Sequence, residues 1–84
     1  MPTKDEFREE LQARFRRAME RGAKEIVVNS GELHRALGGY PGQGHQMPSC
    51  CDVMHEAQRS GDEEKSSPPS GRGASLTIRY RLPR

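Results

Sequence analysis

The N-terminal quarter of the chain shows the apolar periodicity of an amphipathic helix. Its apolar side chains recur every three or four residues and form one stripe: Phe7, Leu11, Phe15, Ala18 and Met19. Thr3 and Glu6 have the spacing of a capping box, in which each side chain bonds the backbone N–H of the other residue. Gly22 suits the end of a helix. The pattern therefore predicts a helix over residues 3–21.

A β-branched run follows this helix and predicts a short strand over residues 25–28. Asn29 or Ser30 can then cap a second helix, which we assign to residues 30–37. The apolar edge of this second helix consists of Leu33, Ala36 and Leu37. Strand and helix thus follow each other with almost no linker between them.

A third helix is predicted over residues 48–59. Proline suits the first position of a helix, which Pro48 occupies, and apolar side chains then gather on one side of it. These side chains are Cys50, Cys51, Val53, Met54 and Ala57. Residues 39–46, between the second and third helices, are rich in glycine and have no helical or strand period. They predict a long loop.

The C-terminal part of the chain predicts a hairpin over residues 62–82. Residues 75–82 alternate strictly between apolar and polar side chains, which is typical of a half-buried strand. One face of this strand carries Leu76, Ile78, Tyr80 and Leu82, and the other carries Thr77, Arg79 and Arg81. The proline- and glycine-rich residues 67–74 form the loop, and the polar residues before them supply the partner strand.

The predicted order is helix, strand, helix, helix, strand, loop and strand. This order resembles the winged-helix family, in which three helices pack on a small antiparallel sheet of two to three short strands. The resemblance covers the whole chain and implies an α+β fold. It also implies DNA binding, with the third helix in the major groove and the last hairpin as a wing. The segments GELHRALGGYPG and MPSCCDVM also look like parts of short bacterial proteins, a likeness that implies no activity.

Composition indicates one small domain over residues 1–84, with only a slight basic excess. Lys and Arg number 14 against 12 Asp and Glu, and the net charge of +2 is far below that of a dedicated nucleic-acid binder. We see no apolar segment typical of a signal peptide and no apolar run of the ~18 residues that a membrane span needs. Cys50 and Cys51 are adjacent, too close to bridge each other, and reduced thiols suit the cytoplasm. We expect a cytoplasmic protein that contacts no membrane.

The third helix itself is poorly suited to DNA. Its outward positions include Asp52 and Glu56, which phosphates would repel. A better surface is the loop before this helix together with the start of the helix: Gln43, His45, Gln46 and Ser49. The hairpin adds basic residues from a segment without acidic residues: Arg72, Arg79 and Arg81. These seven residues form the predicted site for double-stranded DNA.

The arginines of the last strand have a second interpretation. The acidic stretch 62–64 lies in the partner strand and would pair with Arg79 and Arg81 across the hairpin, at roughly 0.2–1 kcal/mol per pair. Arginines paired in this way would not be available to bind the phosphates of DNA. The alternative function is therefore a protein–protein interaction or adaptor module, or a homodimer, without nucleic-acid binding.

No residue pattern predicts an enzyme, a cofactor or a metal centre. Cys51 and His55 are four residues apart on one helix face, but adjacent cysteines do not provide the paired ligands of a zinc knuckle. A cysteine nucleophile would need a histidine base with its own orienting group, and none is apparent. The segment GGYPGQG lacks the GK[ST] ending of a phosphate loop. We expect a non-enzymatic module without a small-molecule substrate.

Overall fold

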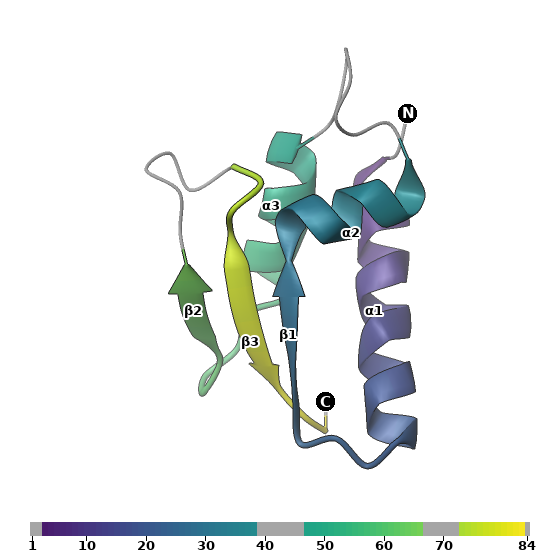
Figure 1. Ribbon diagram of the computed structural model, residues 1–84, viewed down its shortest axis with the longest axis vertical. Helices are drawn as coiled ribbons and strands as arrows, with labels where there is room; N and C mark the ends of the chain where they lie inside the picture. Colours follow the sequence, from purple (N-terminus) through teal and green to yellow (C-terminus); the bar gives the residue numbers. More distant parts are fainter. Residues whose placement is uncertain (1–2, 39–46, 67–72, 84) are drawn as a thin grey trace.

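The computed structural model of the protein describes residues 3–38, 47–66 and 73–83. Within these residues the elements are α1 (Lys4–Glu20), β1 (Glu25–Asn29), α2 (Ser30–Leu37), α3 (Met47–Glu56), β2 (Glu63–Ser66) and β3 (Thr77–Arg81) (Figure 1). The strands form one antiparallel sheet in the order β1-β3-β2. This confirms the predicted α+β arrangement of three helices and a small antiparallel sheet. Membership of the winged-helix family stays a prediction.

Local hydrogen bonds fix where α1 and α2 begin. Thr3 Oγ1 accepts a bond from the Glu6 N–H at 3.2 Å, and the Thr3 N–H donates to Glu6 Oε1 at 3.0 Å, which confirms the predicted capping box. Asn29 caps α2, because its Oδ1 accepts a bond from the Glu32 N–H at 3.1 Å. Gly22 follows α1 with a φ of +79°, a conformation that glycine adopts without steric cost.

α2 has a more polar inner face than its sequence predicted. Leu33 is buried as expected, but Ala36 is exposed. Ser30 and His34 occupy buried positions instead, because α2 turns the side chains at 30, 33 and 34 toward the core. The ring of His34 meets the ring of Phe7 edge to face, with 4.9 Å between centroids.

α3 ends at Glu56 and not at residue 59 as predicted. Beyond it, the Arg59 N–H donates to Asp62 Oδ2 at 2.7 Å, which makes a tight turn in place of another helical turn. The Tyr80 hydroxyl donates to the Met54 carbonyl at 2.8 Å and so satisfies one of the carbonyls that a helix end leaves open. A residue far along the chain therefore helps to terminate α3.

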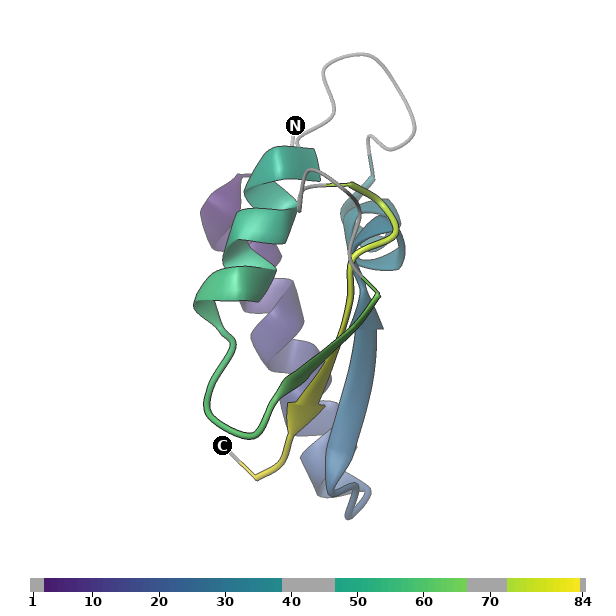
Figure 2. The same ribbon diagram turned by 90° about the vertical axis from the view of Figure 1, so that its left-hand side faces the viewer.

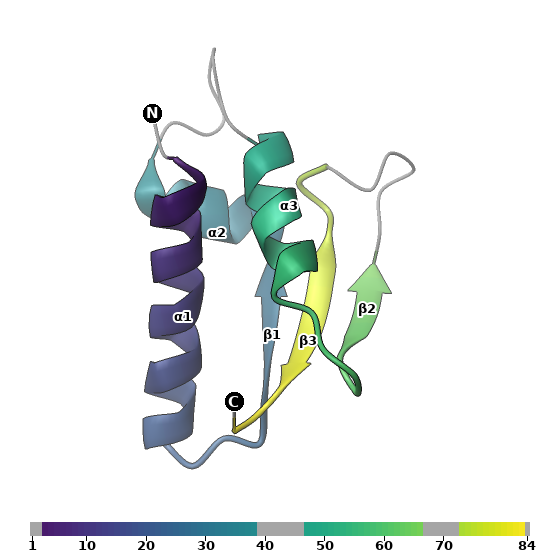
Figure 3. The same cartoon turned by 180° about the vertical axis from the view of Figure 1, so that it is seen from behind.

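α1 and α3 lie on the same face of the sheet, while α2 crosses one end of it between β1 and α1 (Figures 2 and 3). The register pairs Val28 of β1 with Ile78 of β3, and both side chains are buried against the helices. The alternation predicted for β3 is confirmed, because Leu76, Ile78, Tyr80 and Leu82 are all buried. Tyr80 and Phe15 meet edge to face at 4.9 Å between centroids, and this contact joins the sheet to α1.

The opposite face of the sheet is open along most of its length (Figure 1). Val27 is 54% exposed on that face, and every residue of β2 is exposed. Because side chains alternate along a strand, the odd-numbered residues of β1 and β3 belong to this open face and the even-numbered residues belong to the core.

Candidate functional site

Two connecting segments, residues 39–46 and 67–72, contain most of the predicted DNA-binding residues. Both segments are attached to the same end of the molecule (Figure 1). This end, marked by Gly38, Met47, Ser66 and Gly73, is the loop end. Four predicted site residues, Gln43, His45, Gln46 and Arg72, lie outside the described residues. Ser49 is half-buried in the first turn of α3, at the loop end.

The two strand arginines lie elsewhere. Arg79 and Arg81 belong to the open face of the sheet, away from α3, and β3 runs from the loop end toward the other end of the molecule (Figures 1 and 3). Arg79 lies between two carboxylates, with 3.5 Å to Glu63 Oε2 and 3.7 Å to Glu25 Oε1. Its predicted pairing across the hairpin is confirmed. Ser49, Arg79 and Arg81 therefore do not form one surface.

Glu63 is held in its ionised form by its neighbours. A hydrogen bond from Lys65, the charge of Lys65 and the charge of Arg79 together lower the pKa of this carboxyl below its ordinary value. Because both edge strands contribute a carboxylate to Arg79, its charge is compensated within the fold. An approaching phosphate would have to compete with Glu25 and Glu63 for the guanidinium.

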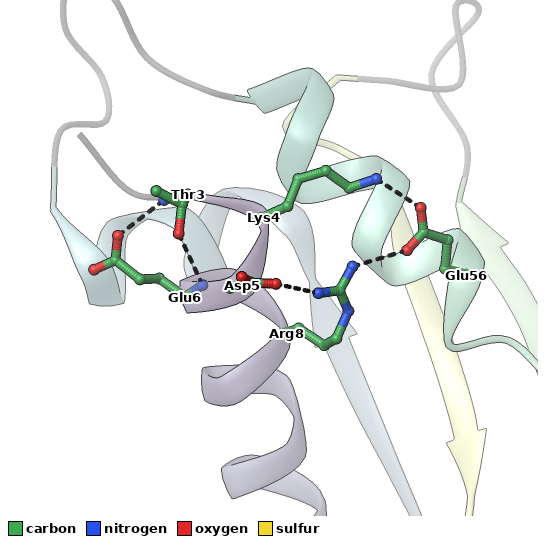
Figure 4. Close-up of polar contacts among 6 residues, drawn as sticks. All are labelled: Thr3, Lys4, Asp5, Glu6, Arg8 and Glu56. Atoms are coloured by element: carbon green, nitrogen blue, oxygen red, sulfur yellow. Dashed lines mark hydrogen bonds and ion pairs between the residues drawn. The ribbon is translucent and has the colours of Figure 1, made fainter.

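The exposed flank of α3 is joined to α1 by an ion network (Figure 4). Glu56 accepts hydrogen bonds from Lys4 Nζ at 2.7 Å and from Arg8 Nη2 at 3.3 Å. Arg8 also donates to Asp5 Oδ1 at 2.5 Å. The hydrogen bonds from Lys4 and then Arg8 lower the pKa of the Glu56 carboxyl. The helix expected to enter DNA thus carries a carboxylate on its flank that two cations of α1 already neutralise.

Beneath the loop end lies a cluster of buried polar side chains around one carbonyl. The Gly73 carbonyl accepts hydrogen bonds from Ser30 Oγ at 2.7 Å and from Cys51 Sγ at 3.4 Å. Cys50 Sγ donates to the Ser30 carbonyl at 3.5 Å. The end of the β2–β3 connection is therefore fastened to both α2 and α3. The predicted place of both cysteines on the apolar side of the third helix is confirmed, because each is fully buried.

The thiol of Cys50 is unsuited to nucleophilic chemistry. Burial raises its pKa to about 12, with a further contribution from Cys51 that the charge of Arg14 opposes. The thiolate is the reactive form of cysteine, so this group is protonated and inert near neutral pH.

The pair considered for zinc binding makes other contacts. Cys51 bonds the Gly73 carbonyl, and His55 Nδ1 lies 3.3 Å from Glu64 Oε1. In residues 3–38, 47–66 and 73–83, no three His, Cys, Asp or Glu side chains gather as a metal site would require.

The end of the molecule opposite the loop end is rich in uncompensated cations. Most described Lys and Arg side chains make ion pairs or other polar contacts. Four of those in the described segments make none: Arg16, Arg21, Lys24 and Arg59. They come from the second half of α1, the α1–β1 turn and the α3–β2 turn (Figures 1 and 3). This end, together with Arg81 of β3, is the cationic end.

The cationic end was not predicted from the sequence. The sequence shows arginines late in α1, but their lack of carboxylate partners depends on which faces the fold leaves open.

No protein-family model, curated protein or solved structure matches the chain. None of the described helices is long and apolar enough to cross a membrane. Function is therefore inferred from the two ends of the molecule.

Proposed function

We propose that the domain is a non-enzymatic module that binds double-stranded DNA through its loop end. The observation that supports this proposal is the attachment of both candidate DNA-binding segments, 39–46 and 67–72, to the same end of the fold. Ser30 and Cys51 fasten Gly73 to α2 and α3, so the residue that follows the second segment has a fixed position at the loop end.

The residues of this proposed site are fewer than the sequence suggested. Ser49 lies at the start of α3, where backbone N–H groups and the helix dipole favour a phosphate. Gln43, His45, Gln46 and Arg72 belong to the two connecting segments. Arg79 and Arg81 are left out, because both belong to the open face of the sheet and Arg79 is compensated by two carboxylates.

A salt series of binding to a fluorescent random-sequence duplex tests this proposal. Affinity should fall steeply with salt, because bound phosphates release counterions. Arg72→Ala should weaken binding and lower the log–log salt slope by about 1. Arg79→Gln is the matched control, which removes one charge from the same hairpin and should leave affinity unchanged. Equal effects of the two variants, or no binding at low salt, would contradict the proposal.

A second candidate is a protein-interaction module without nucleic-acid binding. The specific observation that favours it is the flank of α3, where Asp52 and Glu56 lie one turn apart and Glu56 already engages Lys4 and Arg8, two cations that a phosphate backbone would need. A double variant, Asp52→Asn with Glu56→Gln, separates the candidates. It should strengthen duplex binding if α3 faces DNA. If the flank meets a protein, including a second copy of the chain, the variant should instead weaken that complex, as measured by light scattering on a size-exclusion column.

A further inference from the structure

We infer that the cationic end is a docking surface for an acidic polypeptide segment, and this inference is independent of the DNA proposal. Three segments distant in sequence build it, and hydrogen bonds hold them together. The Lys24 carbonyl accepts a bond from the Leu82 N–H at 2.9 Å. Asp62 accepts bonds from the Arg81 N–H at 2.8 Å and the Arg59 N–H at 2.7 Å. The cations therefore stand on a preorganised backbone.

Arg59 stands between two surface hollows. The first, of about 210 Å³, lies between α1 and α3; besides the ion-paired Arg8 and Glu56 it includes the apolar side chains of Val53 and Ala57. The second, of about 270 Å³, lies beside the end of β3 and includes Leu82 and Pro83. A guanidinium flanked by two partly apolar hollows matches a peptide that alternates a carboxylate with larger side chains.

The first hollow continues along α1. A shallow hollow of about 510 Å³ runs along α1, where Arg8, Gln12 and Arg16 lie one turn apart on the same helix face. Asp5 and Glu9 line its part nearest the start of the helix. Gln12 lines both this hollow and the one beside Arg59. The surface is thus an extended track that joins Arg59 to Arg16 through Gln12, which is longer than a single bound anion would need.

An acidic peptide fits this track better than a nucleic-acid backbone does. Arg presents a planar fork that binds a carboxylate through two parallel hydrogen bonds. Glu20, Glu25 and Asp62 are interspersed among the cations and would face a continuous row of phosphates, whereas a peptide can place neutral residues opposite them. A duplex backbone also offers no apolar groups for the hollows beside Ala57 and Pro83. The position opposite the loop end leaves both ends of the molecule accessible at once.

The test uses a short fluorescent peptide of alternating Glu and Leu, with an otherwise identical Gln peptide as the probe control. We expect the Glu peptide alone to bind and to shift the amide resonances of residues 16–24, 57–62 and 79–83. The triple variant Arg21→Gln, Lys24→Gln, Arg59→Gln should weaken binding about tenfold, because it removes three exposed ion pairs with the peptide, each of modest strength.

The double variant Lys4→Gln, Lys65→Gln is the charge control, because it removes cations that Glu56 and Glu63 already compensate and that line none of the three hollows. It should change the affinity for the Glu peptide much less than the triple variant does. Equal losses in the two variants would show nonspecific attraction and overturn the inference. Shifts confined to the loop end would overturn it as well. So would a random-sequence duplex that moves the same amides at lower concentration than the peptide, because that would identify the cationic end as a nucleic-acid surface.

Discussion

Replacing Tyr80 by Phe tests how much the hydrogen bond from the sheet to the end of α3 stabilises the domain. The Tyr80 hydroxyl donates to the Met54 carbonyl at 2.8 Å, and both residues are fully buried. The carbonyls of the last helical turn have no partner within the helix, and the Tyr80 hydroxyl donates a hydrogen bond to one of them. Phe keeps the aromatic contact with Phe15 and removes the donor alone.

The expected loss of stability follows from the Met54 carbonyl, which loses its hydrogen bond from Tyr80 in the variant. A buried polar group without its hydrogen bond costs about 1–3 kcal/mol. A domain of 84 residues is stable by roughly 4–13 kcal/mol, at about 0.05–0.15 kcal/mol per residue. Tyr80→Phe should therefore remove a substantial part of the stability of this domain. A loss of about 2 kcal/mol corresponds to a fall in Tm of about 8–16 °C at this chain length.

Urea unfolding followed by far-ultraviolet circular dichroism measures this loss directly. The midpoint should fall while the m-value stays constant, because the variant exposes the same surface on unfolding. Tyr80→Leu is the companion variant, since it removes the ring as well and should cost more than Phe does. If Tyr80→Phe unfolds within about 0.5 kcal/mol of the wild type, which is the usual range of an indifferent surface change, the bond to Met54 does not stabilise the end of α3.

Three further variants or reagents test other parts of the structure. Gly31→Ala should destabilise the domain in urea, because the added Cβ would lie 3.1 Å from the backbone oxygen of Ala74. This close contact should outweigh the advantage of about 1 kcal/mol that alanine has over glycine in a helix. Cys50, with its pKa raised to about 12, should react with a thiol reagent at the rate of unfolding, and added urea should accelerate the reaction. Hydrogen bonds from Lys4 and Arg8 lower the folded-state pKa of Glu56, so its stabilising effect exists above the ordinary value of 4.5 and disappears as pH falls through the folded value. Glu56→Gln should accordingly lose less stability on acidification than the wild type, measured by urea titrations at a series of pH values.

Short-range patterns predicted most of the fold. The Thr3–Glu6 capping box, the stripe of α1 and the alternation of β3 depend only on residues close in sequence, and each appears as expected. The predicted end of α3 was wrong for the opposite reason. The Arg59 N–H donates to Asp62, and the Tyr80 hydroxyl donates to the Met54 carbonyl. The helix therefore ends where contacts with residues outside it begin.

The candidate sites were harder to predict because compensation of charge depends on distant residues. The pairing of Arg79 with Glu63 follows from the hairpin register, but its second partner, Glu25, belongs to a strand brought alongside by the whole fold. Glu56 meets Lys4 across 52 positions of sequence, and no local pattern reveals that contact. The cations that remain uncompensated can be recognised only after these pairs are known.

The position of β3 in the sheet also governs when the domain can fold during its synthesis. β1 and β2 each pair with β3 and not with each other, so neither gains a neighbouring strand until residues 77–81 have left the ribosome. Until then α1 and α3 lack the apolar surface of Leu76, Ile78 and Tyr80 that covers them. A nascent chain that stalls before this point exposes its helices' apolar faces to chaperones and to other unfinished chains. Of the three described strands, the one synthesised last is thus the one on which the pairing of the other two depends.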